Sequence, residues 1–128
     1  MIYVDTSVAL AQLLSEDRVP PAELWDRPLI ASRLIEYEMW TRIHARGLTR
    51  SHRPAVTELL HRLALIELVG PVLARAREPF PDSVRTLDAL HLASIDFLRD
   101  HGQDVQLASY DQRQVALARK MGITALEL

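Results

Sequence analysis

Several acidic side chains stand out because of where they fall relative to the expected strands and helices. Asp5 directly follows the short apolar run 1–4, and Asp111 comes three residues after the apolar segment 104–108. In parallel sheets, ligands bind outside the carboxyl ends of the strands, so these two acids from opposite ends of the chain are expected to meet at one edge. Each acid could instead simply cap the helix that follows it, because Asp is a favoured N-cap residue.

Asp88 belongs to the segment 86–99, which predicts the most strongly apolar helix of the chain. At about 100° per residue, Asp88 shares one stripe of this helix with Leu92 and Ile95. A carboxylate on a buried stripe is costly unless it is paired or binds a metal. The helix dipole offers partial compensation near the N-terminus, and Arg85 is an alternative, structural partner.

The expected helix 32–46 carries two further candidates, Glu36 and Glu38. They lie on opposite flanks of its apolar stripe, so helical geometry does not choose between them. Arg42 follows Glu38 at i+4, and an exposed ion pair is therefore the structural alternative for that glutamate.

Three polar side chains near these acids also call for interpretation. Ser7 and Ser109 are placed to orient a carboxylate or a bound water, or are ordinary cap and turn residues. His91 follows Asp88 by one helical turn, but a lone histidine there is more often packed and hydrogen-bonded than bound to a metal.

The elements expected to position these side chains alternate between strand and helix. The strands are predicted at 1–4, 28–31, 66–69, 104–108 and 123–126, and the helices at 7–15, 32–46, 54–64, 72–77, 86–99 and 111–121. This alternation predicts βαβ units and a mainly parallel sheet with helices on both faces. No internal repeat or linker divides the chain, so we expect one α/β domain over residues 1–128.

Composition narrows the function classes. The absence of cysteine excludes disulfides, thiolate zinc sites and cysteine nucleophiles. The net charge of −2 does not indicate a nucleic-acid binder. Acids that line a metal site would, however, hide a basic groove from the net charge of the whole chain. The four aromatic residues Trp25, Trp40, Tyr37 and Tyr110 are too dispersed to predict a base-stacking platform. No stretch approaches the roughly 20 apolar residues that span a bilayer, so we expect a soluble, cytoplasmic protein.

Four segments in this order resemble the PIN-domain family, and in particular the VapC toxins of bacterial toxin–antitoxin pairs. They are Ile2–Ser7, Ser32–Glu38, Arg85–Ala93 and Ala108–Asp111. The resemblance implies a three-layer α/β/α sandwich, three or four acids that coordinate Mg²⁺ or Mn²⁺, and endonucleolytic cleavage of RNA. It also implies a cognate antitoxin and a homodimer.

The resemblance also assigns the acids by position. Asp5, Asp88 and Asp111 match the first, third and fourth acids of the family. The family commonly places its glutamate six residues after the serine, which selects Glu38 and leaves Glu36 as the reserve candidate.

Hard oxygen ligands without cysteine or a histidine cluster suit Mg²⁺ or Mn²⁺ better than zinc. We therefore expect a Mg²⁺-dependent endoribonuclease in which Asp5, Glu38 and Asp88 hold one or two metals, directly or through water. Asp111 would complete the cluster or orient the attacking water. Arg42, Arg46 and Arg85 are candidates for binding the flanking phosphates.

Two alternatives remain. The chain could be a catalytically silent PIN-like module that binds RNA or protein. A phosphotransferase with an aspartyl nucleophile would usually want a second Asp at the position of Ser7, which argues against that class.

Overall fold

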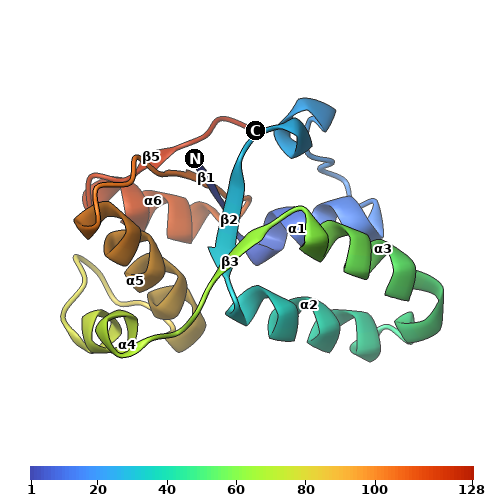
Figure 1. The fold of residues 1–128 in the computed structure, drawn as a ribbon, viewed down its shortest axis with the longest axis horizontal. Helices are drawn as coiled ribbons and strands as arrows, with labels where there is room; N and C mark the ends of the chain where they lie inside the picture. The colour runs from blue at the N-terminus through green and yellow to red at the C-terminus, as the bar shows by residue number, and fades with distance from the viewer.

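The computed structural model describes residues 1–128, which form a five-stranded parallel sheet with helices on both faces (Figure 1). The strands are β1 (Ile2–Val4), β2 (Leu29–Ser32), β3 (Ala64–Ile66), β4 (Gln106–Ala108) and β5 (Thr124–Ala125). The helices are α1 (Thr6–Leu14), α2 (Leu34–Ala45), α3 (Thr49–His61), α4 (Gly70–Arg77), α5 (Thr86–Asp100) and α6 (Gln112–Lys120), with a short 3-10 helix η1 (Ala22–Asp26).

The strand order β3-β2-β1-β4-β5 places β1 at the centre of the sheet. Tyr3 of β1 pairs with Ile30 of β2 on one side and with Leu107 of β4 on the other. Strands β2 and β3 lie on one side of β1, and β4 and β5 lie on the other. The strand order therefore reverses between β1 and β4. A parallel α/β sheet binds ligands at such a switch point, outside the carboxyl ends of its strands.

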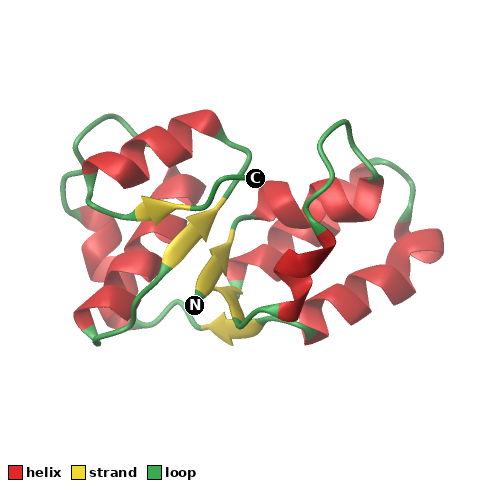
Figure 2. Ribbon diagram, turned by 90° about the horizontal axis from the view of Figure 1, so that it is seen from above, coloured by secondary structure: helices red, strands yellow, loops and turns green.

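Two apolar cores lie on opposite faces of the sheet. Ile2 and Val4 point into the core formed with α1, α2 and α3, whereas Tyr3 points into the core formed with α5 and α6. This alternation follows from the period of two along a strand. Figure 2 shows the two groups of helices on either side of the strands. The predicted three-layer α/β/α sandwich with a parallel central sheet is confirmed.

Some element boundaries were predicted wrongly. Helix α3 begins at Thr49 instead of residue 54, so Pro54 lies inside the helix. Burial of Val56 and Leu59 stabilises the helix despite the backbone hydrogen bond that a proline removes. Strand β3 covers Ala64–Ile66 instead of 66–69, because these residues pair with β2 and Gly70 already begins α4. The helix η1 was not predicted.

No helix combines the length and the apolar character that crossing a membrane requires.

Candidate active site

A cavity of about 520 Å³ lies at the carboxyl edge of β1. All four predicted acids line it: Asp5, Glu38, Asp88 and Asp111. They come from four separate parts of the chain: the end of β1, α2, α5 and the N-cap of α6. The topology therefore brings the predicted acids to one place, while their chemical role stays a prediction.

Asp5 is buried and firmly held. Its Oδ2 atom accepts hydrogen bonds from the Ser7 backbone N–H (3.2 Å), the Ser7 hydroxyl (2.6 Å) and the Ser109 hydroxyl (3.0 Å). Its Oδ1 atom accepts none, so one carboxylate oxygen has no partner within the protein. Asp5 is thus both the N-cap of α1 and a member of the cavity wall, and both serines orient its carboxylate.

Glu38 is held from the other side of the cavity. Its Oε1 atom accepts hydrogen bonds from the Thr6 hydroxyl (2.9 Å) and from His91 Nε2 (2.5 Å). The ion pair with Arg42 that helical spacing suggested does not form, because Glu38 pairs with His91 instead. Glu36 contacts Arg33 at 2.8 Å and is absent from the cavity lining. Of the two glutamates, only Glu38 faces the other acids.

His91 and Tyr3 continue this chain of hydrogen bonds into the core. His91 Nδ1 lies 2.7 Å from the Tyr3 hydroxyl, which also accepts a hydrogen bond from the Ser32 backbone N–H at 3.2 Å. Burial strongly raises the pKa of Tyr3, so its hydroxyl stays protonated. His91 is packed and hydrogen-bonded, as expected for a histidine at this helical position.

The charge state of His91 reflects two opposed effects. Burial acts to lower the pKa of His91, whereas the hydrogen bond that its Nε2–H donates to Glu38 and the charges of Glu38, Asp5 and Asp88 raise it. The net result is a pKa above the ordinary value for histidine. The negative charge of the cavity therefore favours the protonated, positively charged form of His91, although this side chain lies in the neighbouring core.

Asp88 and Asp111 face each other across Arg85. The Arg85 guanidinium lies 3.4 Å from Asp88 Oδ2 and 3.8 Å from Asp111 Oδ2. Partial burial, followed by the charge of Asp111, raises the pKa of Asp88, and the charge of Arg85 opposes this rise. Asp88 is less buried than its helical stripe suggested, because the first turn of α5 opens onto the cavity.

Asp111 also caps α6, since its Oδ1 atom accepts hydrogen bonds from the backbone N–H groups of Arg113 (3.0 Å) and Gln114 (3.2 Å). Asp111 thus caps a helix and lines the cavity, as Asp5 does. Each acid uses one oxygen for the cap, and Asp111 keeps Oδ2 on the side of Arg85.

The side chains do not form a ready-made metal cluster, since no three carboxylate or imidazole groups lie close enough to share one ion. Asp88 and Asp111 lie toward Arg85, whereas Asp5 and Glu38 are held by hydroxyl and imidazole donors. The donor set nevertheless has the hard oxygen ligands that Mg²⁺ takes, and Mg²⁺ usually keeps several waters between itself and protein. The residues present fit such an ion when some ligands act through water or after side-chain rotation.

Sequence reasoning did not identify Tyr3 and Thr6 as parts of this site. Tyr3 offered one signal, a hydroxyl in the middle of an otherwise aliphatic strand. Its hydrogen bond to His91 depends on which face of β1 it occupies, and this was not visible before the strand register was known.

A parallel α/β sandwich with acids gathered at its switch point defines a class of carboxylate-lined domains suited to hard cations. The family model of the PIN domain matches residues 2–120, and the chain belongs to this family.

Individual relatives agree with this membership. Ribonuclease VapC47 of Mycobacterium tuberculosis (strain CDC 1551 / Oshkosh) is 29% identical over an alignment of 133 positions, which covers 95% of this chain and 93% of that protein. The crystal structure of VapC20 of Mycobacterium tuberculosis, described as a sarcin-ricin loop cleaving toxin, matches with a TM-score of 0.70 and 20% identity over 100% of both chains. A toxin–antitoxin complex from Klebsiella pneumoniae matches with a TM-score of 0.62 and 17% identity over 91% of each chain. The two structures share the fold of this chain.

Proposed function

We propose that this protein is a Mg²⁺-dependent endoribonuclease and the toxin of a VapBC-like toxin–antitoxin pair. The observation that carries the proposal is the convergence of Asp5, Glu38, Asp88 and Asp111 on one cavity at the switch point of the sheet. The names of the relatives support it, since one is a ribonuclease and another is a toxin that cleaves the sarcin-ricin loop.

Asp5, Glu38 and Asp88 would hold Mg²⁺, or Mn²⁺ in its place, directly or through water. When bound, such a cation lowers the pKa of a water molecule and neutralises charge that develops on the scissile phosphate. Asp111 would complete the ligand set or orient the attacking water through Oδ2.

The protein's own part is to hold these groups in place before RNA arrives. The Ser7 and Ser109 hydroxyls fix the Asp5 carboxylate, and His91 fixes that of Glu38. Such preorganisation favours the transition state because little rearrangement is needed during the reaction. Arg85 lines the cavity and has a guanidinium that suits phosphate oxygens. No side chain needs to form a covalent bond to RNA.

The proposed partners are an RNA substrate, a cognate antitoxin and a second copy of this chain, in the cytoplasm. The antitoxin is supported by the structural likeness to a chain solved within a toxin–antitoxin complex. The homodimer rests on the resemblance to VapC toxins.

A catalytically silent PIN-like module that binds RNA or protein is the second candidate. One observation favours it, namely that no three potential ligands lie close enough to share an ion. Measuring cleavage directly separates the two candidates.

The test is cleavage of labelled RNA by highly purified protein with Mg²⁺ and with EDTA. Asp5→Asn and Asp88→Asn are expected to lower the rate more than about 100-fold, because even loss of groups that support metal ligands costs about 10- to 100-fold. Asp104→Asn is the matched control, since Asp104 is exposed and precedes β4 at the opposite edge of the sheet. Equal rates for folded variants and parent, or no effect of chelation, would refute the proposed metal mechanism.

A further inference from the structure

A second cavity of about 500 Å³ adjoins the acid-lined cavity. Ser7, Leu10 and Arg42 line both cavities, so the two are neighbours along α1 and α2. The second cavity contains none of the four predicted metal ligands.

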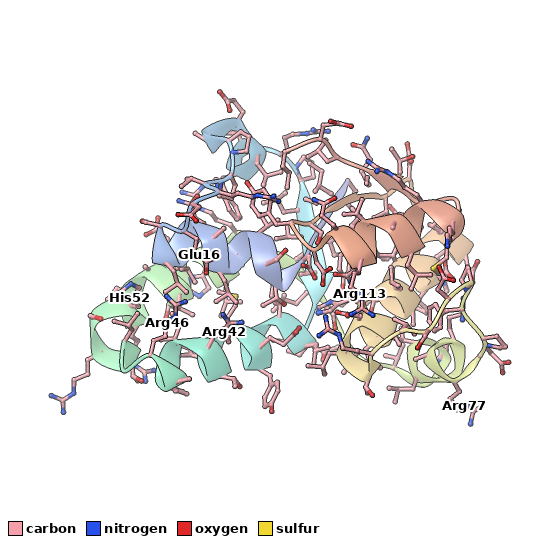
Figure 3. All side chains as sticks on the ribbon, turned by 180° about the vertical axis from the view of Figure 1, so that it is seen from behind. Glu16, Arg42, Arg46, His52, Arg77 and Arg113 are labelled. Carbon is pink, nitrogen blue, oxygen red and sulfur yellow. The ribbon has the colours of Figure 1, made fainter.

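Three arginines line this second cavity without an ion-pair partner. Arg18, Arg42 and Arg46 have no carboxylate within 4.0 Å, although Glu16 and Asp17 also belong to the lining. Arg42 in α2 and Arg46, the C-cap of α2, are exposed, and Figure 3 shows them side by side, facing the end of α1 near Glu16. Residues four apart on a helix are separated by about 6 Å along its axis and lie on one face, a spacing that suits successive phosphates of a nucleic-acid strand.

Tyr110 supplies an aromatic ring to the same cavity. Its backbone N–H donates to the Ser7 hydroxyl at 2.9 Å, and that hydroxyl donates to Asp5 at 2.6 Å. The backbone of Tyr110 is therefore tied to the acid site through Ser7. The ring is partly buried against the core of α1, α2 and α3, and the Arg18 guanidinium lies over it, 5.6 Å from the ring centroid. A base would therefore stack on the ring where the Arg18 guanidinium now lies.

We propose that this second cavity is a nucleotide-binding subsite for RNA. The base of a nucleotide adjacent to the scissile phosphate stacks on Tyr110, and the phosphates that flank it contact Arg42 and Arg46. Aromatic stacking is tolerant of sequence, because every base has a π-face. A base stacked on protein must leave its neighbours in the strand, so the subsite takes single-stranded RNA in preference to duplex.

This inference rests on the proposed function, because the subsite is defined by its distance from the cleavage site. It differs from the sequence interpretation in one respect. The aromatic residues do not form an extended platform, but a single ring beside three unpaired arginines is enough to receive one base.

The experiment measures RNA binding without cleavage. A fluorescent single-stranded RNA of about twelve nucleotides, within the usual range of single-strand site sizes, is titrated into Asp88→Asn protein in EDTA, and anisotropy gives the Kd at several salt concentrations. In this background, Arg42→Ala and Arg46→Ala are each expected to weaken binding several-fold and to reduce the salt slope by about 1. A duplex of the same sequence should bind more weakly than the single strand.

Tyr110 is tested by two substitutions that both retain apolar bulk. Tyr110→Phe keeps the aromatic face and should bind within about twofold of the parent, whereas Tyr110→Leu should weaken binding at least about fivefold with the salt slope unchanged. Arg77→Ala is the matched control, because Arg77 is an exposed arginine of α4 that lies far from Arg42 and Arg46 (Figure 3). Thermal melting verifies that each variant is folded.

The subsite is refuted if folded Tyr110→Leu binds like the parent, or if Arg42→Ala and Arg46→Ala behave like Arg77→Ala. This result leaves Mg²⁺-dependent cleavage untouched, so the two proposals fail separately. Conversely, weakened binding in these variants supports the subsite even when the parent protein shows no cleavage.

Discussion

The four acids of the cavity differ in the strength of the hydrogen bonds and ion pairs that hold their carboxylates. Asp5 and Glu38 each accept short hydrogen bonds on one oxygen, from Ser7 and from His91 respectively. Asp88 and Asp111 face Arg85 at 3.4 and 3.8 Å, distances of loose ion pairs. The site thus has a fixed half and an adjustable half, and Arg85 occupies the position where the adjustable acids would turn toward a cation.

This arrangement predicts that Arg85 competes with Mg²⁺ for Asp88 and Asp111. Arg85→Ala should therefore raise Mg²⁺ affinity about two- to fivefold, the range expected from a solvent-exposed ion pair. Isothermal titration calorimetry measures the change, with Arg77→Ala as control. A lower Mg²⁺ affinity in Arg85→Ala would show that the guanidinium supports the site instead of competing.

The two glutamates of α2 provide a matched pair of substitutions. Glu38 lines the cavity, whereas Glu36 pairs with Arg33 on the outer surface. Glu38→Gln should lower Mg²⁺ affinity at least about tenfold, and Glu36→Gln should leave it within about twofold. If calorimetry gives the reverse order, Glu36 is the second acid and side-chain positions in α2 must change on metal binding.

At the scale of elements, hydrogen bonds from Tyr3 through His91 to Glu38 connect β1, α5 and α2. This connection crosses the sheet, because Tyr3 belongs to the core of α5 and α6 while α2 covers the opposite face. It fixes the distance between two helices that carry predicted ligands. The chain of hydrogen bonds is therefore both a structural link and a support for the site.

Tyr3→Phe tests this link by removing one hydroxyl. The Ser32 N–H and His91 Nδ1 would lose a buried partner, which costs about 1–3 kcal/mol of unfolding free energy. Urea denaturation measures the loss, and Tyr37→Phe is the control because Tyr37 is 64% exposed. Equal stability of Tyr3→Phe and the parent protein would mean that the hydroxyl contributes nothing to the fold.

The raised pKa of His91 predicts how stability depends on pH. The pKa of His91 is higher in the folded protein than in the unfolded chain, where it is about 6.5. Protonated His91 therefore stabilises the folded state fully at pH values below about 6.5, and this stabilisation is lost as the pH rises through the folded pKa. The difference in unfolding free energy between the parent protein and His91→Gln should thus be larger at pH 6 than at pH 9. Denaturation at both pH values measures it, and a difference that grows with pH would contradict the assigned direction.

The elements also show what the sequence permitted us to predict. Alternating apolar runs and helical stripes predicted the parallel sandwich, because burial on both faces makes strands such as Ile2–Val4 continuously apolar. The edge strand Ala64–Ile66 was misplaced because it is only partly buried and carries a weak pattern. The start of α3 was misplaced because Pro54 resembled a residue of the first helical turn. The helix begins five residues earlier, at Thr49, and burial of Val56 holds it against the core.

For the candidate site, position after a strand predicted that Asp5 and Asp111 would meet at one edge of the sheet, and the apolar helix made Asp88 a candidate. The choice of Glu38 over Glu36 came from family resemblance, because both flank the same stripe. The partners Tyr3 and Thr6 depend on strand register and on side-chain rotation, and the sequence pattern carries no information on either. Arg85 was expected as a partner of Asp88, and the structure adds its approach to Asp111.

At the scale of the whole molecule, the fold concentrates negative charge at one edge of the sheet. The charges of Asp111 and Asp5 both contribute to the raised pKa of Asp88, so the acids repel one another within the cavity. Such repulsion opposes folding unless a cation compensates it. A net charge of only −2 over the chain hides this local excess.

The proposed function depends on the four acids forming one site for a divalent cation. The most direct test is anomalous diffraction at the manganese edge from crystals grown with Mn²⁺, which locates the ion without reference to activity. We expect a peak in the acid-lined cavity, with oxygen atoms of Asp5 and of at least one other acid at about 2.0–2.6 Å from the ion. Crystals that hold Mn²⁺ only elsewhere, or that show no peak there at concentrations supporting cleavage, would contradict it.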